Sequence, residues 1–344
     1  MAVVLAGGRG RSAALALASI VLLLIAMAVA VAIGEVAVPI DVIAKTIAKH
    51  AFGMHFQLDA IQEGIVWNYR LSRTVVAACA GTALALSGAI LQALLRNPLA
   101  EPYVLGVSAG ASTGAVSIAI LGLGGGLISL SAGAFVGAVA AFALVALLAS
   151  RTGSGTDRVV LSGVAGSQLF NALTAYIVTT SANAEQARGV MFWLLGSLGG
   201  ARWGDAALAA PTVAIGTAVC LYHARALDAF AFGADAAASL GVPVTRVRTI
   251  LFALTAAMTA VMVSLVGSIG FVGLVVPHAV RLLAGPGHDR LLPASAVAGA
   301  VFMVLADIAS RIIVPQQVVP IGVVTALVGA PAFAALLFRS RSSP

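Results

Sequence analysis

The sequence predicts an all-α polytopic membrane protein with about ten transmembrane helices and short broken helices at its outer mouth. Of its 344 residues, 61% are hydrophobic and only 9% are charged, and the mean hydropathy is +1.08. A soluble chain carries roughly a quarter charged residues. Apolar stretches of about 20 residues, long enough to cross a bilayer core, recur along the whole chain. No linker or shift in composition divides residues 1–344, so we expect a single membrane domain.

The first predicted helix, 12–34, follows Arg9 and Arg11. Its apolar length exceeds the roughly 7–15 residues of a secretory signal core, so we interpret it as a retained helix that also directs insertion. The stretch 35–66 is the longest one outside the predicted spans. Within it, residues 38–52 carry apolar side chains at helical spacing, which predicts a short surface helix.

The clearest break between two spans is RNPLAEP at 96–102. Its prolines and charged residues would leave backbone groups unpaired in hydrocarbon, so this joint must leave the bilayer core. It separates a helix predicted over 68–95 from one over 102–122. In the latter, glycines recur every four residues, a spacing that lets membrane helices approach closely. These are Gly106, Gly110 and Gly114, and Gly133 and Gly137 repeat the spacing in the next helix.

The interrupted, amphipathic stretch 181–203 predicts a short broken helix near the outer mouth. Arginines are in excess over acids in one set of alternate loops and balanced by acids in the other set. By the positive-inside rule, this asymmetry predicts an even number of spans with both termini in the cytoplasm. The net charge of +7 therefore reports topology in a lipid bilayer and does not indicate a nucleic-acid partner.

The remaining predicted helices are 127–150, 159–180, 205–225, 245–268, 270–284, 293–313 and 320–338.

Three further segments accompany RNPLAEP in a characteristic order: GSIGFVGLVVPHAVRLL (267–283), ADIASR (306–311) and PIGVVTALVGAP (320–331). Together, from about residue 65 to the C-terminus, they resemble the permease subunit of the bacterial iron-chelate and vitamin B12 ABC importers. The resemblance implies a homodimer in the inner membrane, with two ATPase subunits below it and a periplasmic substrate-binding protein above it.

The chain itself is not expected to be an enzyme. A P-loop requires Gly-Lys-Ser/Thr, whereas both lysines, Lys45 and Lys49, follow alanine. ATP would therefore be bound by partner subunits. GVSAG at 106–110 matches a hydrolase pattern, but a nucleophile elbow needs a preceding strand, so an intramembrane hydrolase using Ser108 is disfavoured. The alternative of a gradient-driven secondary carrier stays open, although it would normally place ionisable groups at span centres, where this sequence has almost none.

Two interaction sites follow from the resemblance. Arg70, Arg73 and Arg311 match arginines that receive carboxylates of the binding protein, which suits the two-point geometry of guanidinium groups. The usual proline between the first pair is Ser72 here, and a glutamate common near the last span is missing, with Gln316 and Gln317 upstream. The second site is the cytoplasmic stretch 228–244, which matches the helix that couples to the ATPase. Its residues are Gly233, Asp235, Ala236, Ala237, Ala238, Ser239, Leu240 and Gly241.

The cargo is expected to be an iron chelate, with haem ahead of ferric siderophores and cobalamin third. Arg188 could hold an anionic group such as a haem propionate, and Tyr176, Met191 and Trp193 could line the same pathway. No covalently bound cofactor is expected, and haem or another chelate enters only as transported substrate. No metal site is predicted, because Cys79, Cys220 and the scattered histidines have no ligand spacing.

Overall fold

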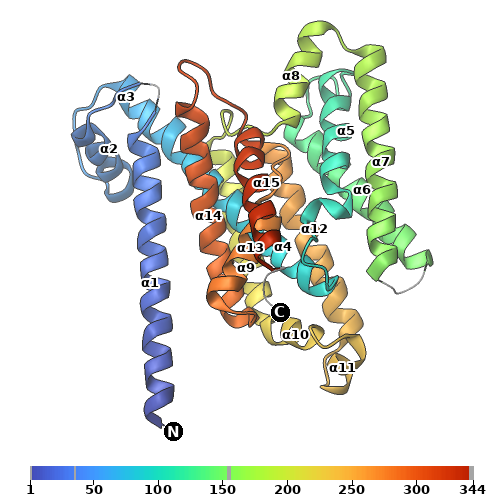
Figure 1. Ribbon diagram of the computed structural model, residues 1–344. Coiled ribbons are helices and arrows are strands. Elements are labelled where there is room, and N and C mark those ends of the chain that lie inside the picture. Colours follow the sequence, from blue (N-terminus) through green and yellow to red (C-terminus); the bar gives the residue numbers. More distant parts are fainter. Residues whose placement is uncertain (1, 35, 153–155, 341–344) are drawn as a thin grey trace.

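The computed structural model describes residues 2–34, 36–152 and 156–340 as a bundle of helices (Figure 1). The only extended pairing in those ranges is an isolated bridge between Val314 and Gln317. Ten helices correspond in order to the ten predicted spans, which confirms the fold class. They are α1 (Ala2–Ala32), α4 (Ser72–Leu94), α5 (Val107–Ala119), α6 (Leu130–Thr152), α7 (Thr156–Ser181), α9 (Trp203–Tyr222), α12 (Val244–Val266), α13 (Val272–Ala284), α14 (His288–Ile312) and α15 (Ile321–Ser340).

Short helices lie at the two ends of this bundle (Figure 1). We call one end the α11 end: it carries α10 (Ala224–Phe230), α11 (Ala234–Ser239) and the start of α1. The opposite α8 end carries α8 (Ala184–Leu194), α2 (Ile40–Phe52) and α3 (Ala60–Gly64). The predicted surface helix and the predicted broken helix are thus both present, as α2 and α8.

Two predicted boundaries were wrong. The helix expected over 102–122 starts as the short 3-10 helix η2 (Pro102–Leu105), turns at Gly106 with φ +77° and continues as α5. The helix expected over 205–225 stops at Tyr222, and α10 follows after His223. Left-handed backbone at a glycine ends a helix locally, and a hydropathy pattern does not register it.

Within the described residues, five helices are both long and apolar enough to cross a membrane by length and composition: the continuous stretch Ala60–Leu94 that ends with α4, then α6, α9, α12 and α14. Shorter apolar helices run over Leu17–Ala32, Val107–Ala119, Val272–Ala284 and Ile321–Leu336. The first stretch begins with α3 and passes through the π-helical segment η1 (Ile65–Leu71). These features describe a multi-pass membrane protein.

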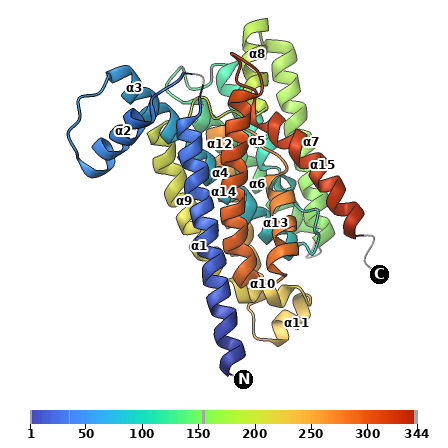
Figure 2. The same cartoon turned by 60° about the vertical axis from the view of Figure 1, so that its left-hand side comes forward.

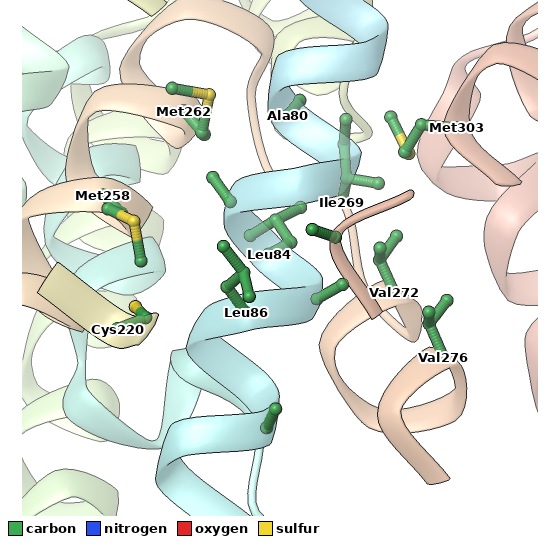
Figure 3. Close-up of a cluster of buried hydrophobic side chains, with 14 of the residues drawn as sticks. Ala80, Leu84, Leu86, Cys220, Met258, Met262, Ile269, Val272, Val276 and Met303 are labelled. Atoms are coloured by element: carbon green, nitrogen blue, oxygen red, sulfur yellow. The ribbon is translucent and has the colours of Figure 1, made fainter. Parts of the chain in front are cut away.

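Helix α4 lies in the centre of the core and most of its residues are buried. Figure 3 shows Leu84 and Leu86 of α4 between Met258 and Met262 of α12 on one side and Val272 of α13 on the other. Glycine contacts bring the helices unusually close. A Cβ on Gly81 would lie 2.0 Å from the carbonyl oxygen of Gly299 in α14. Small residues at such crossings let backbones touch, which replaces the hydrophobic drive that lipid does not supply.

The glycine spacing in the third and fourth spans has the same consequence. A Cβ on Gly110 of α5 would lie 2.3 Å from the carbonyl oxygen of Gly137 in α6, and one on Gly114 would lie 2.1 Å from that of Gly133. The predicted close approach of these two helices is therefore confirmed, as a packing feature.

Three interruptions of the helices meet inside the bundle: the turn after α8, the loop between α12 and α13, and the start of α15. Ser197 N donates to Val266 O at 2.8 Å, Ile321 N donates to Gly196 O at 3.0 Å, and Gly322 N donates to Leu195 O at 3.1 Å. The Tyr103 hydroxyl accepts from Ile269 N at 2.7 Å. Irregular backbone is tolerated at membrane depth when protein groups satisfy it, as they do here.

Candidate docking and coupling surfaces

The three arginines assigned to docking lie together near the α8 end, but they are buried. Arg73 is paired with Asp307, a partner that the sequence analysis did not identify, and 2.7 Å separates Nε from Oδ1. Its other nitrogens donate to the Tyr69 hydroxyl at 3.0 Å and to Ser310 Oγ at 3.4 Å. The pair joins α4 to α14 with both side chains 1% exposed. The sequence did contain one signal for Asp307. In ADIASR it lies four positions before Arg311, so the two side chains share one face of a helix and can pair.

The other two arginines hold the end of α1. Arg311 Nη2 lies 3.2 Å from Asp307 Oδ2 and 3.0 Å from the carbonyl oxygen of Ala30, to which it donates. Arg70 Nη1 donates to the carbonyl oxygens of Val31 and Ala32, each at 3.0 Å, and its Nη2 donates to that of Val36. The last carbonyls of a helix have no intrahelical donor and carry partial negative charge. These guanidinium groups therefore cap α1 from inside the bundle.

A small hollow beside this cap reaches two of the arginines. It has a volume of about 120 Å³ and is lined by Gly34, Val36, Ile65, Tyr69, Arg70 and Arg311. We call Arg70, Arg73, Asp307 and Arg311 the arginine cluster. It contains three cations and one carboxylate, so the cluster itself carries a net positive charge. Docking by these arginines stays a prediction, because no partner is present.

The coupling segment is exposed at the α11 end. Helix α11 covers Ala234–Ser239, so the expected helix from Asp235 to Leu240 is displaced by one residue. Gly233 (φ +101°) and Gly241 (φ +81°) bound it with backbone conformations that favour glycine. Ala237 faces inward, while Leu240 is 70% exposed and Phe232 is 78% exposed. The remaining predicted residues, Asp235, Ala236, Ala238 and Ser239, are exposed or half-buried.

Leu240 and Phe232 leave apolar surface open on either side of α11. Sequence reasoning missed Phe232, which lies just before the predicted glycine boundary.

A second contact that the sequence did not reveal ties this segment to the core. Asp228 Oδ1 on α10 accepts from the backbone N of His288 at 2.9 Å and lies 2.6 Å from its Nδ1. His288 begins α14, the helix that also carries Asp307 at its other end. A single continuous helix therefore runs from the coupling segment to the arginine cluster. Burial raises the pKa of Glu101 in the RNPLAEP joint.

The candidate pathway residues are divided between two environments. Tyr176 on α7 is 66% exposed, Met191 on α8 is 61% exposed, and Arg188 is also exposed. Trp193 instead packs against a buried cluster formed by residues of α4, α5, α6 and α12, and it lines a hollow of about 180 Å³ with Leu130 and Gln186. Trp193 thus attaches α8 to its neighbours, whereas the other three side chains face outward.

Nothing in the described residues forms a catalytic or metal centre. Ser108 Oγ donates to Ser268 Oγ at 2.9 Å, within the junction of interrupted helices. No group of three or more His, Cys, Asp or Glu side chains in the described ranges could hold a metal ion. Cys79 and Cys220 are free thiols in α4 and α9.

Comparison with known proteins agrees with this architecture. The FecCD transport family matches residues 22–339. The chain is 43% identical over 295 residues to the cobalamin import system permease protein BtuC of Halobacterium salinarum, covering 86% of this chain and 78% of the relative. It is 39% identical over 285 residues to the vitamin B12 import system permease protein BtuC of Escherichia coli, covering 81% and 85%.

Two further matches extend the comparison. The chain is 38% identical over 313 residues to the ABC transporter permease protein YvrB of Bacillus subtilis, covering 89% of this chain and 88% of the relative. A solved inward-facing structure described as a metal-chelate type ABC transporter superposes with a TM-score of 0.83 at 29% identity, covering 94% of this chain and 99% of the other. The chain therefore belongs to the FecCD transport family and is a non-catalytic permease subunit of an ABC importer, whose ATPase resides on separate subunits.

Proposed function

We propose that this permease imports a corrinoid of the cobalamin type into the cytoplasm through the inner membrane. The observation that carries the proposal is the placement of an exposed short helix, α11, at one end of the bundle and a net positive arginine cluster at the other. This arrangement suits a pore that is driven from one side and loaded from the other. Cobalamin is preferred to haem as the candidate substrate because relatives with 43% and 39% identity are named as cobalamin and vitamin B12 permeases.

Haem, the first expectation from sequence, is the second candidate. It is supported by Arg188, an exposed cation on α8 near the exposed Tyr176 and Met191, because a haem propionate would need a cation. Ferric siderophores with a net negative charge need the same kind of cation. Cobalamin has amide side chains in place of free carboxylates, and its cobalt-corrin cation balances its one phosphodiester, so the dependence of uptake on Arg188 separates anionic cargo from cobalamin.

The working unit of the proposal is a homodimer with its pore between the two copies. Helix α15 makes its main helix contacts with α14 and α13, and several of its apolar side chains are exposed. Apolar side chains are exposed on α15, and others are exposed on α7 and α8. Figures 1 and 2 show the course of these three helices. Exposed apolar rows of this size indicate contact with lipid or with another chain. The residues are Leu169, Leu173, Tyr176, Met191, Phe192, Leu327 and Val328.

In this arrangement the α11 end faces the cytoplasm and both chain termini lie on that side. Two ATPase subunits would bind α11 and its flanking Phe232 and Leu240, since a short helix with little apolar surface of its own fits a groove on a partner. A periplasmic binding protein would dock above the arginine cluster and place a carboxylate near Arg70 and Arg311, at the hollow they line. Burial of both arginines in the free permease means that docking has to move the end of α1.

Reconstitution tests the proposal directly. Proteoliposomes containing this chain, its co-expressed ATPase and its binding protein are supplied with labelled cobalamin, haem or ferric siderophores. We expect cobalamin to accumulate only when ATP is present on the side of the membrane that carries the ATPase subunits. The variant R188Q should leave that uptake unchanged. Haem uptake that is lost in R188Q would support the second candidate. Uptake that ignores ATP but collapses with an uncoupler would indicate a gradient-driven carrier and overturn the proposal.

A further inference from the structure

A hollow of about 610 Å³ opens at the α11 end, beside the coupling segment. It lies where α9 ends, α10 turns away and α12 begins. Its volume is within the range of small-molecule sites. The residues that line it are Tyr222, His223, Arg225, Ala226, Ala229, Leu240, Gly241, Val242, Pro243, Arg246, Val247 and Ile250.

The charge of this hollow has one sign. Arg225 and Arg246 contribute two guanidinium groups, no carboxylate is among the lining residues, and neither arginine forms an ion pair with any residue that the structure describes. His223 Nδ1 is bonded to the carbonyl oxygen of Val219 at 2.9 Å, so this nitrogen carries the proton and the ring is held in place. Two unpaired arginines beside a fixed imidazole form a site for an anion.

The depth of the hollow points to a membrane component. Both α9, which ends at Tyr222, and α12, which begins at Val244, are apolar enough to cross a bilayer. Their ends therefore lie at headgroup level. Leu221 is 41% exposed and Tyr222 is 84% exposed beside the entrance, and tyrosine is the residue expected where hydrocarbon meets headgroups.

We propose that this hollow binds the phosphodiester headgroup of an anionic phospholipid from the cytoplasmic leaflet. Guanidinium groups hold phosphate oxygens in two-point geometry, and basic pockets between cytoplasmic helix ends recognise anionic headgroups. Val247 and Ile250 on α12 supply apolar wall where the acyl chains leave the headgroup. Because Leu240, Gly241 and Val242 form one side, a bound lipid would contact the coupling segment and restrain α11.

The proposal uses the orientation assigned under the proposed function, but its test needs neither transport nor ATP. The purified full-length permease is incubated in mixed micelles of phosphatidylglycerol and phosphatidylcholine, and retained lipid is counted by native mass spectrometry. The variant R225Q/R246Q is compared with R248Q/R290Q, which removes the same charge from the same end of the bundle. Arg248 lies on α12 outside this hollow, over the Phe252 ring, and Arg290 is exposed on α14.

We expect wild type to retain phosphatidylglycerol over phosphatidylcholine, and R225Q/R246Q to lose about tenfold of that preference. The matched control should stay within about twofold of wild type. Equal retention in R225Q/R246Q, or an equal loss in both variants, would overturn the proposal. Binding of glycerol phosphate without selective retention of phosphatidylglycerol would assign the site to a soluble phosphate compound and overturn the proposal. If R225Q/R246Q retains phosphatidylglycerol as wild type does but fails to co-purify with the ATPase, the proposal is overturned and the two arginines are assigned to the ATPase interface.

Discussion

Arg73 on α4 and Asp307 on α14 form a buried ion pair with 2.7 Å between Nε and Oδ1. The other oxygen of the same carboxylate lies 3.2 Å from Arg311 Nη2. One carboxylate thus serves two guanidinium groups, and carbonyls at the end of α1 accept from Arg311 and Arg70. Buried charges are costly unless opposite charges accompany them, as they do here. The cluster therefore ties α1, α4 and α14 together.

Replacing Asp307 by asparagine should strongly destabilise the permease. The change leaves two buried guanidinium groups without their counter-charge, and breaking a buried pair costs about 3–5 kcal/mol. Thermal unfolding of the purified chain in detergent measures the effect.

The matched control is D41N. Asp41 pairs with Lys45 at 2.9 Å on the surface of α2, and a hydrogen bond from Lys45 lowers the pKa of the Asp41 carboxyl. An exposed pair contributes little, so D41N should unfold at nearly the wild-type temperature. Similar unfolding temperatures for D307N and D41N would contradict the importance of the buried pair.

Substituting Arg70 by glutamine should loosen the end of α1. Glutamine cannot reach all three carbonyls of Val31, Ala32 and Val36 that Arg70 now serves. Hydrogen exchange of the segment 29–38, followed by mass spectrometry, should become several-fold faster while exchange in α6 is unchanged. The half-buried Lys49, which pairs with Glu63 at 2.9 Å, provides the control K49Q, for which the segment should exchange as in wild type. Unaltered exchange in R70Q would show that the cap does not hold α1.

The contact between Asp228 and His288 should transmit signals between the ATPase and the outer end of the permease. In D228A the bond to His288 is lost and α10 is no longer fixed to α14. We expect stimulation of ATPase activity by the binding protein to fall several-fold, with basal ATPase activity retained. D289A removes the neighbouring, exposed acid on α14 and should keep the stimulation. Equal stimulation in wild type and D228A would remove this contact from the coupling route.

A single methyl group at Gly81 should disturb the centre of the bundle. Its Cβ would meet the carbonyl oxygen of Gly299 at 2.0 Å, so α4 and α14 would have to separate. Overpacking of this kind costs about 1–3 kcal/mol, which G81A should show as a lower unfolding temperature. G64A is the control, since nothing lies within 4 Å of a Cβ at Gly64. An unchanged unfolding temperature in G81A would show that the crossing can relax.

Several parts of the fold could be read from local signals. The ten apolar stretches, the α5–α6 glycine spacing and the glycine-bounded helix α11 were all predicted at nearly their observed positions. The turn at Gly106 and the split at His223 escaped prediction, because a hydropathy pattern continues smoothly through both. In the candidate site, sequence brought Arg70, Arg73 and Arg311 to the same end of the molecule but said nothing of their burial.

The sequence by itself determined that this protein spans a membrane, which segments are helical, and which family of permeases it belongs to. Those properties depend on composition and on spacing within one helix, where 3.6 residues per turn relates order to position. The tertiary structure alone decided that Arg73 pairs with Asp307, that Asp228 meets His288, and that Trp193 faces α5 instead of the exposed side of α8. Such pairs are separated by up to 234 positions. They form only when helices pack, because packing selects which polar groups can satisfy one another away from water.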